Sequence, residues 1–468
     1  MFRSLLVVFL AFAAGIAHAQ ESALRADFRR EGEHFREACG KFGLKTVVGC
    51  ATELFTDHPL HVAVGSIAPQ NGFGFGGAFV TNYTPNESWR LSWNVDAVVS
   101  TNASWRAGAY MKIIHTPVVT IRPVVLKPGE KPPTLAVHPY TVFNVYAQSI
   151  SLNKLNFFGL GNNSTVAGKS LFGMQETILG VNAIKPVTEW SAISKLNLSL
   201  LGEVNGRFVD LRGNHGSSTP SIETLYTEAT APGLTNQPAF VQLGQGVRIK
   251  PNLGEYFELN YLANFQEFFA PSNSHYSFLR WTIDLGHTFL LYGHTQSYEA
   301  KDTNGPDECA PSLGAQKCPP VSFSRNLAGS IGVRLLLSES INSASSVVPF
   351  YFQPTLGGSD INGAPSLSSY QDYRFRAPNI LLLRESFEHS IWGPFGFTFM
   401  ADQGKVALTR GDVGFDHLKH SFGAGLTLRG GGLPAVFLTF AWGGNEGTHT
   451  TGTVNTSLLG GSSRPSLY

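Results

Sequence analysis

Apolar and polar residues alternate along several stretches of this chain. Between positions 195 and 208, most even positions are apolar and most odd positions are polar or charged. A period of two residues predicts β-strands, because successive side chains of a strand point to opposite faces of its sheet. The same alternation runs through residues 257–266, 279–289, 327–337 and 436–442.

The length of these runs favours a transmembrane antiparallel β-barrel over a soluble β-sandwich. Many reach the roughly 9–11 residues that a tilted strand needs to cross a bilayer, whereas soluble strands average about 5–6. Tryptophans near the strand ends suit the interfacial girdles of such barrels: Trp89, Trp105, Trp281, Trp392 and Trp442. We expect an all-β fold of about 16 strands between Gly72 and Leu459, with a soluble sandwich as the alternative.

Composition agrees with a membrane barrel and argues against other classes. Apolar residues make up 43% and charged residues 14% of the 468 positions, whereas roughly a quarter of a soluble domain is usually charged. Beyond the N-terminus, no window holds the ~18 unbroken apolar residues of a membrane helix. The net charge of +1 argues against nucleic acid as a partner.

The N-terminus predicts export. Arg3 gives a basic start, an apolar run follows from Leu5 to Ile16, and Ala17-His18-Ala19 fits the small-x-small cleavage pattern of a signal peptide. We therefore expect a signal peptide at 1–19, a short periplasmic tether or plug at 20–60, and the barrel with its C-terminal tail at 61–468. Export and strand pattern together indicate a bacterial outer membrane.

Four cysteines form two local pairs in the sequence, Cys39 with Cys50 and Cys309 with Cys318. In an exported protein, an even number of cysteines in close pairs predicts two small disulfide loops. A metal site is the alternative, although neither pair has CxxC spacing and no histidine pair completes a zinc motif.

Residues 349–405 contain a long, glycine-opened loop and, further on, a very short turn at Gly393-Pro394. Long loops on one side and short turns on the other are typical of transmembrane barrels. The loop also carries Asp372, and the strand after the short turn carries Asp402 and, two residues later, Gly404. The candidate loop-anchoring residues are Gly357, Gly358, Arg374, Arg376, Asp402 and Gly404.

An ordered set of motifs resembles the bacterial surface antigen barrel of the BamA/TamA outer-membrane assembly-factor family. The pieces are NFFGLGNNS at 156–164, FYFQPTLGG at 350–358, SYQDYRFR at 369–376, FTFMADQG at 397–404 and HSFGAGLTLR at 420–429. The resemblance implies that the loop between strands 11 and 12 folds back into the barrel lumen. It also implies a role in outer-membrane protein assembly or translocation, with outer-membrane lipids and assembly proteins as partners and no cofactor.

The sequence departs from this family where the loop arginine is expected. In place of Arg-Gly-Tyr, the chain has Ser368-Ser369-Tyr370. Because a loop tip buried in a barrel must satisfy its charges, our hypothesis is that Arg374 or Arg376 pairs with Asp402 instead. The alternative is that Asp402 and Gly404 simply end a strand in a polar turn.

The segment 20–60 is also too short for the periplasmic repeat domains that receive client chains in that family. We therefore expect either a separate periplasmic partner or a different use of the fold. The main alternative function is a passive or selective pore, and charges of mixed sign would line its lumen: Lys195, Glu203, Arg207, Glu258, Arg280, Asp284 and Arg334.

We do not expect an enzyme, because the sequence has neither a GxSxG elbow nor an HExxH metal motif. A lipid enzyme of the outer membrane, built from side chains on neighbouring strands, remains a third alternative without a motif of its own.

Overall fold

The computed structural model describes residues 29, 33, 60–86, 88–116, 140–187, 196–214, 217–251, 253, 256–299, 322–392, 395–430, 433–454 and 465–467. Several predictions concern positions outside these described residues. They are the signal peptide at 1–19, nearly all of the segment 20–60, the Gly393-Pro394 turn, Lys195, and the proposed pairing of Cys39, Cys50, Cys309 and Cys318.

Sixteen strands, each paired with its neighbours in chain order, form one antiparallel sheet. The first eight are β1 (Leu60–Ser66), β2 (Phe73–Asn86), β3 (Trp89–Ser100), β4 (Trp105–His115), β5 (Thr141–Phe157), β6 (Ser170–Pro186), β7 (Leu198–Gly213) and β8 (Phe240–Ile249). The other eight are β9 (Phe257–Phe269), β10 (Phe278–Glu299), β11 (Ser322–Ile341), β14 (Asn379–Trp392), β15 (Phe395–Ala407), β16 (Lys419–Gly430), β17 (Leu433–Gly444) and β18 (Gly447–Val454). The predicted all-β class and strand number are confirmed.

A second, two-stranded sheet pairs β12 (Thr355–Leu356) with β13 (Phe375–Arg376) inside the connection between β11 and β14. The remaining elements among the described residues are short: η1 (Val166–Gly168), α5 (Ile222–Leu225), η2 (Ser274–Tyr276), η3 (Phe350–Phe352) and η4 (Arg410–Asp412). In the described part of the chain, no helix has the length and apolar character needed to span a bilayer.

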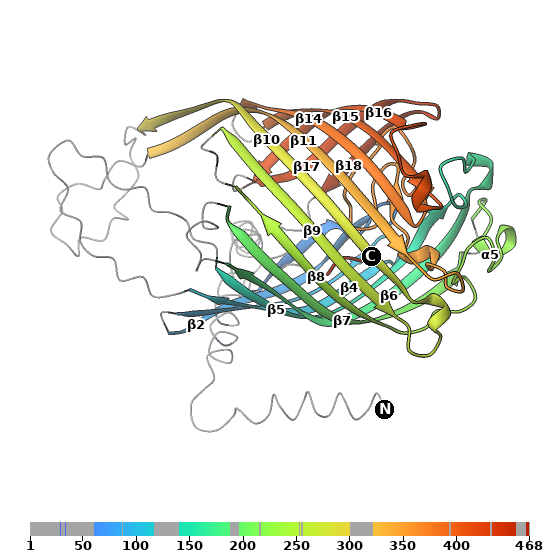
Figure 1. Ribbon diagram of the computed structural model, residues 1–468. Coiled ribbons are helices and arrows are strands. Elements are labelled where there is room, and N and C mark those ends of the chain that lie inside the picture. The colour runs from blue at the N-terminus through green and yellow to red at the C-terminus, as the bar shows by residue number, and fades with distance from the viewer. Residues whose placement is uncertain are drawn as a thin grey trace, which may run out of the picture.

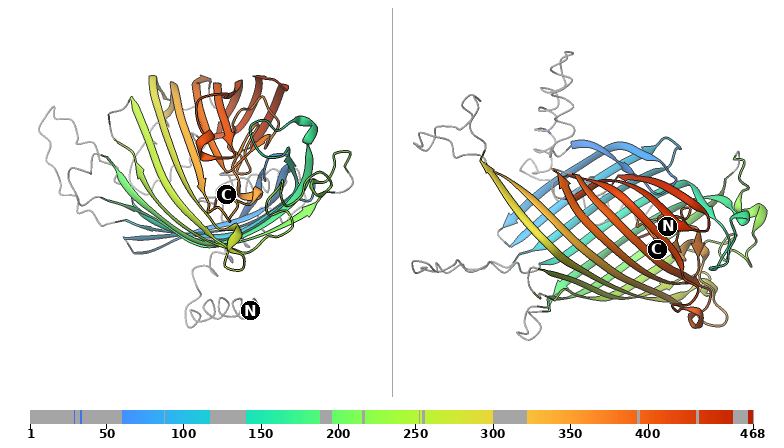
Figure 2. Two further views of the ribbon diagram at one scale, coloured as in Figure 1. Left: turned by 45° about the vertical axis from the view of Figure 1, so that its right-hand side comes forward. Right: turned by 90° about the horizontal axis from the view of Figure 1, so that it is seen from above.

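The large sheet is strongly rolled, and its strands run obliquely around a concave interior (Figures 1 and 2). Rolling brings the first and last strands, β1 and β18, into proximity. No hydrogen-bond ladder joins them among the described residues. At 7 and 8 residues they are also the shortest strands of the sheet. The seam between β1 and β18 therefore has fewer hydrogen bonds than any other pair of neighbouring strands among the described residues.

One strand lies before the interval in which strands were expected. β1 begins at Leu60 and ends at Ser66, ahead of Gly72. Its two faces carry Val62 and Val64 on one side and the small residues Ala63 and Gly65 on the other, with Ala63 and Gly65 buried. Because His61 and Ser66, near the two ends, are its only polar side chains, the alternation that reveals a strand in a sequence is weak here.

The long connections fall at both ends of the sheet. The connection 214–239 follows β7, and three strands, β8, β9 and β10, separate it from the connection between β10 and β11. In an antiparallel meander, connections separated by an odd number of strands lie at opposite ends. Connection 342–378, between β11 and β14, therefore shares its end with the β5–β6 and β7–β8 connections.

The two faces of the sheet have inverted polarity. On β3, Val95 and Val99 are 51% and 54% exposed. The residues on either side of Val95, Asn94 and Asp96, are only 1% and 2% exposed. β7 repeats this pattern with Val204 exposed and Arg207 fully buried. Soluble proteins bury apolar side chains and expose charged ones, so the convex face of this sheet is not an ordinary water-facing surface.

Candidate functional site: the folded-back loop and the concave face

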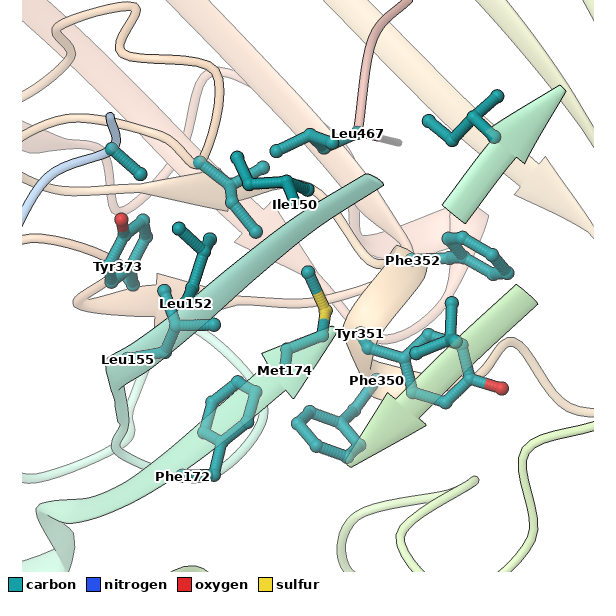
Figure 3. Packing of buried hydrophobic residues seen from close by; sticks show 14 of the residues in the cluster. Ile150, Leu152, Leu155, Phe172, Met174, Phe350, Tyr351, Phe352, Tyr373 and Leu467 are labelled. Atoms are coloured by element: carbon teal, nitrogen blue, oxygen red, sulfur yellow. The ribbon is translucent and has the colours of Figure 1, made fainter. Parts of the chain in front are cut away.

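The connection 342–378, called the long loop below, lies over the concave face of the sheet. Its η3 turn buries three consecutive aromatic residues, Phe350, Tyr351 and Phe352 (Figure 3). The Phe350 ring centroid lies 5.1 Å from that of Phe157 on β5. The Phe352 centroid lies 5.0 Å from that of Phe240 on β8. Edge-on aromatic pairs each stabilise by about 0.5–1.5 kcal/mol beyond area burial, so η3 is anchored to the strands.

Two buried arginines bind the carbonyl groups of this aromatic turn. Arg280 on β10 donates from Nη2 to the carbonyl oxygen of Phe352 at 2.7 Å, and its guanidinium lies 5.2 Å from the ring centre of Phe278. Arg376 on β13 donates from Nη1 to the carbonyl oxygen of Phe350 at 2.7 Å. The turn therefore joins the buried apolar cluster with these two carbonyl groups hydrogen-bonded, which avoids the cost of burying them without partners.

The predicted glycines serve close backbone packing. Gly357 and Gly358 both have positive φ, 107° and 63°, a region that costs other residues strain. A Cβ on Gly357 would lie 2.5 Å from the Cβ of Arg374. Gly404 on β15 allows close packing from the side of the large sheet, because a Cβ there would lie 2.9 Å from Cδ1 of Leu356 in β12. These glycines let the β12–β13 hairpin close and approach the sheet.

Asp402 holds the tip of the long loop, but its charged partner is not the one we expected. Its Oδ2 accepts from the backbone N–H of Leu367 at 2.8 Å. Its two oxygens also accept from Nε and Nη2 of Arg384 at 2.7 and 3.0 Å. The hypothesis that Arg374 or Arg376 pairs with Asp402 is therefore wrong. Arg384 stands directly opposite Asp402 in the β14–β15 ladder, so the strand itself supplies the counter-charge.

Arg384 also takes part in loop binding. Its Nη2 donates to the carbonyl oxygen of Pro365, so one guanidinium joins the Asp402 carboxylate to the loop backbone. At the position where the resembling family carries glycine, Ser369 donates its backbone N–H to Oγ of Ser421 on β16 at 2.8 Å. The loop tip is thus held by backbone contacts to three neighbouring strands, β14, β15 and β16.

Arg374 binds a different part of the molecule. Its Nε pairs with Oε1 of Glu446 at 2.7 Å, and its Nη1 and Nη2 donate to Oγ and the carbonyl oxygen of Ser164 at 2.8 and 2.7 Å. The carbonyl oxygen of Arg376 accepts from the backbone N–H of Gly161 at 2.7 Å. The hairpin therefore bridges the motif at 156–164 and the β17–β18 turn, two segments far apart in sequence.

Charges on the concave face form ion pairs across strands. Arg334 on β11 pairs with Asp284 on β10 through Nε and Nη2, at 2.8 and 2.9 Å. Arg334 stands opposite Arg384 in the next ladder, so two ion pairs of opposite order run across β10, β11, β14 and β15. Asp284 and Arg334, two of the charges of mixed sign that we expected to line the lumen, thus form an ion pair with each other.

Burial raises the pKa of Asp372 in the long loop, although the backbone N–H of Ser359 lowers it by donating to Oδ1 at 3.0 Å. A raised pKa means that the folded state binds the proton more tightly than the unfolded chain does. No group of three or more histidine, cysteine or acidic residues in the described ranges could hold a metal ion.

Comparisons with known proteins give likeness at the level of structure alone. No family model matches the sequence, and no curated protein matches it. The chain is similar to CdiB from Acinetobacter baumannii at 11% identity, covering 84% of this chain and 58% of that chain, with a TM-score of 0.46. It is similar to CdiB from Escherichia coli at 10% identity, covering 85% and 62%, with a TM-score of 0.46.

A structure of BamA from Haemophilus ducreyi lacking POTRA domains 1–3 is also similar, at 10% identity, with 84% and 69% covered and a TM-score of 0.43. The chain spans 58% of the first of these structures and 62% of the second. Likeness of this degree assigns no activity, so a function has to rest on this chain's own side chains.

We predict that Asp402→Asn destabilises the folded protein by about 3 kcal/mol, because removing one member of a buried ion pair leaves the other charge uncompensated. The side chains of Asp402 and Arg384 are only 2% and 13% exposed. Equilibrium unfolding in denaturant measures the change, and protease sensitivity of the long loop should rise with it.

Asp284→Asn is the matched control for Asp402→Asn. Asp284 forms an equally well aligned ion pair with Arg334, and the two side chains are 23% and 38% exposed. Exposed ion pairs contribute only about 0–1 kcal/mol to stability. Equal losses for the two variants would show that the contact with the loop at Asp402 adds nothing.

We predict that Asp372→Asn flattens the dependence of stability on pH. Because its folded pKa is raised, Asp372 contributes most below the unfolded-state pKa of about 4, and that contribution is lost as pH rises through the folded pKa. Thermal unfolding compared at acidic and neutral pH provides the measurement. A variant with the same pH profile as the unsubstituted chain would contradict the assignment.

Proposed function

We propose that this chain is a closed outer-membrane β-barrel that crosses the bilayer with its sixteen strands. The observation that carries this proposal is the inverted polarity of the sheet, whose convex face exposes apolar side chains while its buried charged side chains lie on the concave face. A lipid-facing band of apolar side chains around a polar interior is how membrane barrels are built. Fourteen of the sixteen strands have 10 to 22 residues, enough for tilted strands to cross.

The filled interior supports a gated function in place of an open pore. The long loop packs the aromatic turn 350–352 against β5, β6 and β8 and fixes its tip at Asp402. Steady conduction needs a continuous water-filled path, and these side chains occupy the concave face. We propose assembly or translocation of outer-membrane or exported proteins, with the long loop as the moving element and the β1–β18 seam as the opening.

In this proposal the partners are outer-membrane lipids and periplasmic or outer-membrane assembly proteins, and the chain is not an enzyme. A passive or selective pore is the second candidate. It is supported by the partial exposure of Arg334 and Asp284 on the concave face, which shows that part of the interior is accessible to water.

We predict that Val95→Arg costs about 2–4 kcal/mol of stability in liposomes, since that is the cost of a guanidinium at the lipid-facing midplane of a barrel. Val95 lies near the middle of β3 on the convex face. Urea unfolding of the reconstituted protein gives the number. Val166→Arg, at an exposed position of η1 outside the strands, is the control and should cost little. Equal effects at the two sites would argue against lipid contact at β3.

We predict that a double variant, Phe350→Ala with Phe352→Ala, conducts several times more current in planar bilayers than the unsubstituted chain. Each truncation removes a buried ring, a loss of about 3–5 kcal/mol, so the aromatic turn should leave its seat. Phe415→Ala is the control, because Phe415 is highly exposed in the β15–β16 connection.

The same liposomes test assembly activity directly, with a urea-unfolded eight-stranded outer-membrane barrel as the probe. The unsubstituted chain should accelerate insertion of the probe, measured by its heat-modifiable gel shift. Large steady conductance that the double variant leaves unchanged, together with no acceleration of insertion, would support a passive pore instead.

A further inference from the structure

The segment 465–467 contacts the concave face although it follows the last strand in sequence. Pro465 and Leu467 are both buried. Leu467 is 5% exposed and belongs to the same apolar cluster as Ile150 and Leu152. Figure 3 shows its side chain pointing toward Ile150. This segment is thus packed into the interior beside β5 and the long loop.

Two side chains from distant parts of the chain bind the main chain of this segment. Arg207 on β7 donates from Nη2 to the carbonyl oxygen of Ser466 at 2.8 Å. Asn362 in the long loop accepts from the backbone N–H of Leu467 at 2.8 Å, and its Nδ2 donates to Oγ of Ser466 at 3.3 Å. The contacts therefore recognise a carbonyl group and an N–H group of consecutive residues, plus one apolar side chain.

Arg207 is held rigidly for this contact. It is fully buried, its Nη1 pairs with Oε1 of Glu176 at 2.8 Å, and its Nε donates to the side-chain oxygens of Asn205 and Gln242 at 3.1 and 2.5 Å. Because Nε and Nη1 are fixed by the strand wall, Nη2 is presented to the peptide in one orientation. Preorganised donors of this kind lower the entropic cost of binding.

We propose that Arg207, Asn362 and the apolar cluster around Leu467 form a peptide-binding cradle, whose occupant is the chain's own segment 465–467 and which exchanges it for an extended peptide of the same pattern. Recognition through backbone groups and one side-chain pocket is tolerant of sequence at the other positions. This goes beyond the proposed function, because it assigns a ligand class to the interior and holds whether or not the sheet conducts.

The attached segment competes strongly with any separate peptide. A ligand that belongs to the same chain as its site binds intramolecularly, at an effective concentration that exceeds the concentration of a peptide added in solution at μM levels. Peptide added in solution should therefore bind poorly to the unsubstituted chain. Removing the anchor side chain of the resident segment should open the cradle.

The test uses the full chain in detergent micelles and a fluorescent peptide with the sequence SSRPSLY, that of residues 462–468. Fluorescence anisotropy measures its affinity for the unsubstituted chain and for Leu467→Asp. A carboxylate cannot occupy the apolar pocket without a large desolvation cost, so the variant should bind the peptide at least tenfold more tightly. Leu225→Asp, at an exposed leucine of α5, is the control and should bind like the unsubstituted chain.

Two further measurements fix the site. A peptide with Asp in place of its leucine should not bind Leu467→Asp. Adding Asn362→Ala to Leu467→Asp should weaken binding of the SSRPSLY peptide about tenfold, as the loss of two hydrogen bonds predicts. Equal anisotropy curves for Leu467→Asp and the unsubstituted chain, with both folded by heat-modifiable gel shift, would overturn the cradle. A chain that binds peptide in micelles but fails to insert into liposomes would overturn the proposed function alone.

Discussion

Every buried charged group on the concave face needs a partner within the molecule, and this requirement shapes the interior. Burying an unpaired guanidinium or carboxylate costs far more than most single contacts provide. Glu176 and Asp402 each accept from an arginine on the adjacent strand. The same arginines then use their remaining donors on backbone carbonyl groups of the long loop and of the segment 465–467. The ion pairs thus neutralise buried charges of the strands. They also position the arginine N–H groups that bind the long loop and the segment 465–467.

The strands were predictable because their signal is local. A period of two residues survives wherever one face is apolar and the other polar, and it located β7, β9, β10, β11 and β17. It failed at β1, where His61 is the only polar residue on the face that carries the small residues Ala63 and Gly65. Gly357, Gly358 and Gly404 were named in advance only through the family motifs that they resemble, and their positive φ or close backbone approach became visible in the structure.

The partner of Asp402 was not predictable, and the reason is a single irregular residue. A hairpin closed by a two-residue turn at Gly393-Pro394 would place Arg384 opposite Gln403. A register shift between Ser390 and Trp392 moves the ladder by one position and brings Arg384 opposite Asp402. No alternation pattern reveals such a shift, because one extra residue changes pairing without changing composition. The contact of Arg374 with Ser164 was not predictable either, because the two residues lie 210 positions apart and no local sequence pattern connects them.

The position of the aromatic turn in the chain also affects when its contacts can form during folding. Phe350 contacts Phe157 and Phe172, so a residue made late in synthesis completes a cluster whose walls were made much earlier. Contacts with such large sequence separation form slowly, because a long stretch of chain must be ordered before they stabilise anything. If the sheet closes as proposed, the turn has to reach its seat before the last strands roll over it, and the order of these two events becomes part of the fold.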